Sequence, residues 1–145
     1  MITESVAISR LLVSFLLGAC IGVERQIHRH PAGLRTFTLI CMGSTLAMLV
    51  SIYICQTNLN LINGDPGRIA AQVLTGVGFI GAGLIIKNKD GIVGLTTAAC
   101  IFMTAIIGLA VGVGMIWTAI LVTAIVVILL ISSQFLKFGK EESSN

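Results

Sequence analysis

Long apolar stretches separated by short polar segments make up most of the chain. A stretch of about 18 to 22 apolar residues is long enough to cross a hydrocarbon core about 30 Å thick as an α-helix. Five such stretches occur, at Ser5–Val23, Phe37–Cys55, Ile69–Ile86, Ile92–Val113 and Met115–Leu136. The pattern therefore predicts an all-α integral membrane protein with five transmembrane helices.

The fourth and fifth stretches follow each other with no charged residue between Asp90 and Lys137. A single helix over those 46 residues would be about 69 Å long, more than twice the thickness of the core. The chain must therefore turn back, and Gly112 and Gly114 mark the expected turn.

The composition excludes an ordinary soluble domain. Of the 145 residues, 56% are hydrophobic and 10% are charged, whereas soluble domains have about 25% charged residues. The mean hydropathy of +1.03 points the same way. We expect one membrane domain over residues 1–136 and a short cytoplasmic tail over residues 137–145. The modest net charge of +3 reflects membrane topology and does not indicate nucleic-acid binding.

The basic residues divide unequally between the predicted loops. Seven of the nine would lie on one side, namely Arg25, Arg29, Arg35, Lys87, Lys89, Lys137 and Lys140. Because short loops rich in Lys and Arg stay in the cytoplasm, we expect the N-terminus outside and the C-terminus inside. Arg10 and Arg68 would then lie near the outer side, beside Glu4 and Asp65.

A cleavable signal peptide is the alternative for the first stretch. Arg10 precedes an apolar run, and residues 17–20 loosely imitate a lipoprotein cleavage site. The run continues to Val23, however, and then meets a basic loop of the cytoplasmic type. We favour an uncleaved helix, because cleavage would leave four spans and break the charge pattern.

Two segments of the chain resemble each other. Residues 33–42 (GLRTFTLICM) and 94–103 (GLTTAACIFM) share Gly, Leu, Thr, Ile and Met at equivalent positions, and the same offset places Gly22 on Gly83. Helices one and two and helices three and four therefore form a possible parallel repeat, an arrangement known in transporters. Chance similarity between apolar segments is the alternative.

Residues 76–81 (GVGFIG) match the pattern G-x-G-x-x-G. A dinucleotide site needs that pattern between a strand and a helix, whereas here it lies inside an apolar span, so close helix packing is the better interpretation. The glycines on both faces predict a central third helix. The candidate packing residues are Gly18, Gly22, Gly76, Gly78, Gly81, Gly83, Gly108 and Gly112.

Polar residues also mark the start of the third helix. Asp65 and Pro66 form a good helix start, so capping accounts for Asp65. Its functional alternative is a polar stripe that enters the membrane on one helix face, through Arg68, Gln72, Thr75, Gly76, Phe79 and Gly83. Together with Arg10, this stripe could line a site for an anionic group.

The predicted inner loop carries the remaining candidates. Glu24 and Arg25 form an interfacial ion pair in the simplest interpretation, and the basic loop suits anionic lipid headgroups. His28 and His30 lack a third metal ligand nearby, and the four cysteines show neither disulfide nor metal spacing. No nucleophile occurs with a base and an orienting partner, so we expect no enzyme activity, no cofactor and no metal.

These segments together carry a family resemblance. GACIGVERQ (18–26), GLRTFTLICMGS (33–44), DPGRIAAQVLTGVGFIGAG (65–83) and GLTTAACIFMTAIIGLAVG (94–112) resemble the membrane domain of the MgtC/SapB family. The resemblance implies five helices in the bacterial cytoplasmic membrane, and for MgtC-type members it implies roles in virulence, in low magnesium and in restraining the F-type ATP synthase. Only nine residues follow Leu136, so the chain is closer to short SapB-like members without the soluble C-terminal domain.

Two functions follow as expectations. The first is modulation of a membrane complex through helix association, with ATP synthase as an implied partner. The second is a homodimeric transporter of an ion, magnesium included, or of a small anion. The resemblance implies binding roles for the matching polar positions Glu24, Arg25, Arg35, Thr36, Asp65, Arg68, Gln72 and Thr97. Arg10 joins them from its expected place near the outer side.

Overall fold

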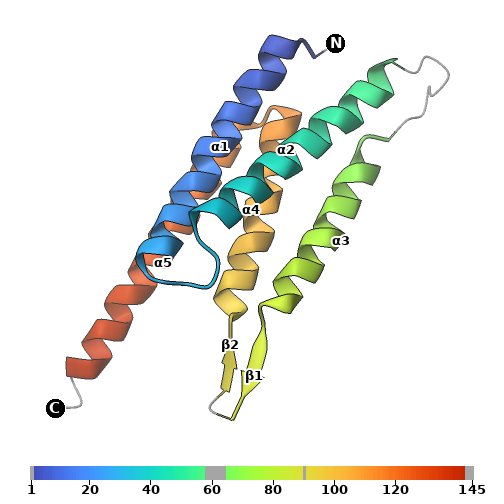
Figure 1. Ribbon diagram of the computed structural model, residues 1–145. Helices are drawn as coiled ribbons and strands as arrows, with labels where there is room; N and C mark the ends of the chain where they lie inside the picture. Colours follow the sequence, from blue (N-terminus) through green and yellow to red (C-terminus); the bar gives the residue numbers. More distant parts are fainter. Residues whose placement is uncertain (1, 58–64, 90, 143–145) are drawn as a thin grey trace.

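A computed structural model describes residues 2–57, 65–89 and 91–142, with side chains as far as residue 132. Over these residues the chain forms five helices and one β-hairpin (Figure 1). The elements are α1 (Glu4–Ile27), α2 (Leu34–Thr57), α3 (Gly67–Gly83), β1 (Ile86–Asn88), β2 (Gly91–Val93), α4 (Leu95–Val113) and α5 (Ile116–Glu142). The prediction of an all-α membrane protein is confirmed, with one helix for each predicted span.

The helices differ in length. Helices α1, α2 and α4 are long and apolar enough to cross a membrane, whereas α3 has 17 residues and the part of α5 with described side chains, Ile116–Ser132, is a shorter apolar helix. Helix α5 continues beyond Leu136, where we expected the span to end. The number of spans and the side of the membrane reached by each end stay predictions.

The connection between α3 and α4 differs from our expectation. The predicted spans reached Ile86 and resumed at Ile92, but both residues belong to an antiparallel hairpin that pairs Ile86 with Val93 and Lys87 with Ile92. Short β-branched runs favour strands when a turn lies between them. Gly94, with φ of +89°, then begins α4 in a conformation that suits glycine.

The turn between α4 and α5 is confirmed at Gly114. This residue has φ of +109°, and its N–H donates to the carbonyls of Ala110 and Val111. Such a left-handed glycine is a common helix stop because it has no Cβ to clash. The chain can therefore reverse within two residues.

Helices α2 and α4 form the centre of the bundle, and α4 packs against all four other helices. The contacts of α2 show how the helices meet. Helix α2 packs against α1 through Gly18 and Gly22, and against α4 through Gly108 and Gly112. A Cβ at Gly18 would lie 2.8 Å from the Cβ of Cys41, and one at Gly112 would lie 2.6 Å from the Cβ of Met48. The predicted small-residue surfaces of α1 and α4 therefore let the backbones of both helices approach α2 closely.

Helix α3 lies at the edge of the bundle, so its predicted central position is wrong for the single chain (Figure 1). It packs against α2 and α4, with Gly81 near Ala98. The other three glycines, Gly76, Gly78 and Gly83, have no atom within 4 Å of an added Cβ. Their spacing predicted that another helix would pack closely against them, but no helix in the described part of the chain does so.

The directions of the helices fit the repeat. Helices α2 and α4 run the same way, with Thr45 donating to the Gly108 carbonyl at 2.7 Å, and α1 and α3 run the opposite way (Figure 1). The α1–α2 loop, the hairpin and the end of α5 lie toward one end of the bundle. We call it the basic end, after the residues Arg25, Arg29, Arg35, Lys87 and Lys89.

Candidate functional site

A buried ion pair lies in the last turn of α1, at the basic end. Arg25 donates from Nε to Oε2 of Glu24 and from Nη2 to Oε1 at 2.7 Å. Only 2% of Arg25 and 7% of Glu24 are exposed. The predicted ion pair is therefore confirmed, and the protein itself shields it from lipid headgroups.

The loop after α1 is folded back onto this pair. His28 Nδ1 lies 2.8 Å from the Glu24 carbonyl oxygen and 3.3 Å from Oε1 of the same residue. The His30 backbone N–H donates to the Arg25 carbonyl at 3.1 Å. Among the residues that the structure describes, no group of three His, Cys, Asp or Glu side chains could hold a metal ion.

A cavity of about 550 Å³ opens beside this loop, at the base of α4. His30 and Pro31 line one part, and Thr96 and Thr97 of the first turn of α4 line another. The remaining walls are mostly apolar, and they come from the end of α3 and the hairpin, with Gly83, Leu84, Ile86, Ile92, Val93, Gly94 and Leu95. The cavity therefore joins a polar helix end to apolar walls.

The first helix turn of α2 lies at the same end and is arranged differently. Gln26, Arg35 and Thr36 line a small cleft with Gly33 and Leu34. The Gln26 side-chain oxygen accepts a hydrogen bond from the Leu34 N–H at 3.2 Å. The predicted residues Arg35 and Thr36 thus surround a helix end that already has a side-chain acceptor.

The predicted outer residues lie on different elements. Asp65 Oδ1 accepts from the Gly67 N–H at 2.8 Å, which confirms the capping role, while Arg68 and Gln72 are exposed on α3. Arg10 instead donates to the Gly112 carbonyl at 2.8 Å. Arg10 therefore contacts the end of α4, whereas Arg68 lies at the start of α3.

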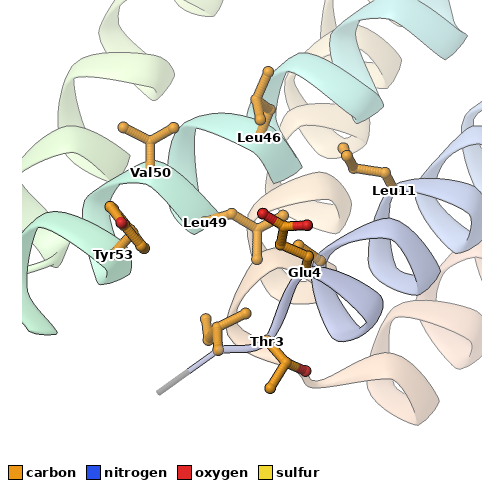
Figure 2. Close-up of a pocket in the computed structure, with 9 residues that line it drawn as sticks. Thr3, Glu4, Leu11, Leu46, Leu49, Val50 and Tyr53 are labelled. Carbon is orange, nitrogen blue, oxygen red and sulfur yellow. The ribbon is translucent and has the colours of Figure 1, made fainter.

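A second cavity, of about 210 Å³, lies between the start of α1 and the end of α2. Figure 2 shows Thr3, Glu4 and Leu11 on one side of it and Leu46, Leu49, Val50 and Tyr53 on the other. Apolar side chains make up most of its lining, and Glu4 is the one acid among the lining residues. This cavity offers little chemistry beyond apolar contact.

Sequence reasoning missed the cavity at the base of α4 and the role of Arg10. Thr97 was singled out, but its neighbours His30 and Ile86 are 67 and 11 residues away in the chain. The repeat was the signal that could have found the site, since it aligns the starts of α2 and α4. Asp90 lies outside the described residues, as do the side chains of Lys137 and Lys140.

A sequence profile of the MgtC family matches residues 11–138, which is most of the chain. The chain belongs to the MgtC family. The matched range includes residues of all five helices.

Curated relatives agree with this assignment. A protein of Escherichia coli K12 named putative magnesium transporter YhiD is 54% identical over 110 residues, which cover 74% of this chain and 51% of the relative. Protein MgtC of Brucella abortus strain 2308 is 40% identical over 79% of this chain and 45% of its own length. An uncharacterised protein of Haemophilus influenzae is 41% identical over 83% of this chain and 52% of its own. The chain thus spans about half the length of these relatives, and no solved structure matches it.

Proposed function

We propose that this MgtC-family membrane protein modulates another integral membrane protein by binding one of its transmembrane helices along the outward face of α3. The observation that carries the proposal is the open glycine face of that helix. Gly76 and Gly83 have no neighbour within 4 Å of an added Cβ, and Phe79 between them is 83% exposed.

The chemistry of this face suits a protein helix better than lipid. Lipid tails gain nothing from glycines, whereas a second helix can approach its backbone closely there. Gln72 is exposed on the same face, and its amide can find a hydrogen-bond partner on a protein but not on a lipid tail. The opposite side of α3, with Val77 and Gly81, is already buried against the bundle.

The charge on this face favours a different protein over a second copy. A two-fold dimer through α3 would place the same surface of both chains in contact, which brings Arg68 of one chain to the depth of the other Arg68. Like charges at one depth repel each other. A partner helix with a carboxylate or free carbonyl at that depth would instead accept hydrogen bonds from the arginine.

The family resemblance supplies the first partner to test. It implies the F-type ATP synthase, and with it a location in the bacterial cytoplasmic membrane. This chain would then hold a membrane-embedded helix of that complex and restrain its activity.

Site-specific crosslinking in native membranes tests the proposal. A photo-crosslinking side chain replaces Phe79, and the crosslinked protein is identified by mass spectrometry. We expect a subunit of another membrane complex, lost in Gly76→Leu and kept in Gly43→Leu, because Gly43 is an equally open glycine on α2. Where that complex is the ATP synthase, its ATP hydrolysis in membranes should rise with Gly76→Leu. Recovery of this chain alone, or equal loss in both variants, would refute the proposal.

Transport is the second candidate function. Its support is the name of the relative YhiD, a putative magnesium transporter, together with the parallel course of α2 and α4. Purified protein in liposomes would then move Mg²⁺ or a small anion, and Arg68→Ala would abolish the flux. If the liposomes show no flux of Mg²⁺ or of any small anion tested, transport is refuted.

A further inference from the structure

The first turn of α4 lacks a side-chain cap. Its earliest backbone hydrogen bond runs from the Ala98 N–H to the Gly94 carbonyl at 2.9 Å, so Leu95, Thr96 and Thr97 present N–H groups beyond the helix end. No side chain accepts from this end of α4 in the described part of the chain. Such a helix end carries about half a positive charge and attracts anions.

The equivalent helix end in the other repeat unit is capped. At the start of α2, the Gln26 side-chain oxygen accepts from the Leu34 N–H. The offset that aligns Gly33 with Gly94 aligns Gln26 with Lys87. A lysine has three donors and no acceptor, so the aligned position of the second unit carries a cation in place of the capping amide.

The Thr97 side chain is a second, independent sign of a ligand. Thr97 is only 3% exposed and lines the cavity at the base of α4. Its hydroxyl takes part in none of the side-chain hydrogen bonds found among the described residues, although Thr45, Thr104 and Thr123, also buried, each donate to a carbonyl. Among the described residues, Thr38 has the buried hydroxyl oxygen that lacks a partner, so the Thr97 oxygen is not sealed off inside the protein. It can therefore donate to a group bound in the cavity that Thr97 lines.

The charges around the cavity favour an anion. Lys87 and Lys89 are exposed on the hairpin that forms one wall, and His30 lines the cavity. Glu24, in the last turn of α1 at the same end of the bundle, accepts two hydrogen bonds from Arg25, which balances its charge. The volume of about 550 Å³ accommodates a tetrahedral anion together with an apolar substituent against the aliphatic walls.

We propose that the base of α4 binds a phosphate group, held by the N–H groups of Leu95, Thr96 and Thr97, by the Thr97 hydroxyl and by Lys87. The phosphate takes the place that the Gln26 oxygen occupies at α2. It can belong to an anionic phospholipid at the membrane surface or to free phosphate in solution, and the two share the same contacts. This site lies at the end of the bundle opposite Arg68, and it shares only Gly83 with the α3 face of the proposed function.

Binding measurements on the purified full chain test the site. The protein is reconstituted in phosphatidylcholine nanodiscs, and inorganic phosphate is titrated while its melting temperature is recorded. A second set replaces part of the phosphatidylcholine with phosphatidylglycerol, and native mass spectrometry counts retained anionic lipid. Stabilisation by phosphate identifies a soluble ligand, and retention of phosphatidylglycerol alone identifies a lipid.

Three variants separate a built site from a merely basic surface. Thr97→Val keeps the shape and removes the hydroxyl, and Lys87→Gln installs the capping residue of the first repeat on an exposed strand. Each should weaken binding about tenfold, as expected for one hydrogen bond to a charged group. The matched control Thr36→Val removes the equivalent threonine at the capped end of α2 and should bind as the native protein does.

Three results would overturn the inference. The first is that neither inorganic phosphate nor phosphatidylglycerol binds. The second is that Lys87→Gln binds with native affinity, and the third is that Thr36→Val weakens binding as much as the two site variants do. The Lys87 variant keeps the test decisive where Thr97→Val fails to fold, because Lys87 is exposed.

Discussion

The contact between Gly22 of α1 and the start of α2 gives a sharp test of the packing. A Cβ added at Gly22 would lie 2.7 Å from Leu34 Cα and 3.1 Å from the Leu34 carbonyl oxygen. Both atoms belong to the backbone, so no side-chain rotation can relieve the overlap. Ordinary carbon–carbon contacts are about 3.5 to 4.0 Å, and α1 and α2 must separate by about 1 Å in Gly22→Ala.

The expected loss follows from two opposing effects. Overpacking of a well-packed core costs about 1 to 3 kcal/mol, whereas replacing a helical glycine with alanine gains up to about 1 kcal/mol. Gly22→Ala should therefore lower the free energy of unfolding by about 1 to 2 kcal/mol, close to tenfold in the unfolding equilibrium. The loss should be larger for Gly22→Val, because its branched side chain adds bulk at the same contact.

The repeat provides a matched control at Gly83. This residue is the equivalent of Gly22 and has no atom within 4 Å of an added Cβ. Unfolding of purified Gly22→Ala and Gly83→Ala in mixed micelles, followed by circular dichroism, measures the difference. Gly83→Ala should match the native stability or exceed it slightly. Equal stabilities of the two variants would show that the α1–α2 contact is not as close as described.

Three further predictions concern the charged residues. Arg10→Ala should lower the free energy of unfolding by about 1.5 kcal/mol, because the last turn of α4 loses a charged donor; Arg10→Lys should recover part of it in the same micelle assay. Glu24→Gln should lower the free energy of unfolding by about 3 kcal/mol or more, because it leaves the Arg25 charge buried without a counter-charge. Adding Arg25→Met should restore much of that stability. A double variant as unstable as the single one would contradict this. In a background without native cysteines, a membrane-impermeant thiol reagent added to intact cells should label Arg68→Cys but not Lys87→Cys, and the reverse pattern would invert the predicted orientation.

Much of the candidate site was predictable as separate residues. Glu24 and Arg25 were paired from adjacency at a helix end, and Asp65 was identified as a cap from its place before Pro66. Thr36 and Thr97 coincide in the repeat, and the family resemblance made them candidate site residues. The signals for these residues are local, because each depends on a few neighbours along the chain.

The surroundings of those residues were not predictable in the same way. The cavity at the base of α4 needs the α1–α2 loop, the hairpin and the start of α4 together, and the hairpin itself looked like the ends of two apolar spans. Arg10 looked like part of an outer polar cluster, yet it donates to the end of α4, 102 residues later. Contacts of that range depend on how helices pack, which composition does not encode.

The sequence by itself determined the number of helices, the turn at Gly114 and the gathering of basic residues at one end. Apolar length and charge placement decide these features, since burying a charge or an unpaired backbone in lipid is expensive. Only the tertiary structure decided which glycines meet a neighbour. Gly22 and Gly83 occupy equivalent places in the repeat, but α2 packs against the first and nothing described covers the second. A glycine on an apolar helix has the same local pattern whether it faces lipid or another helix, so the packing of the whole bundle makes the difference.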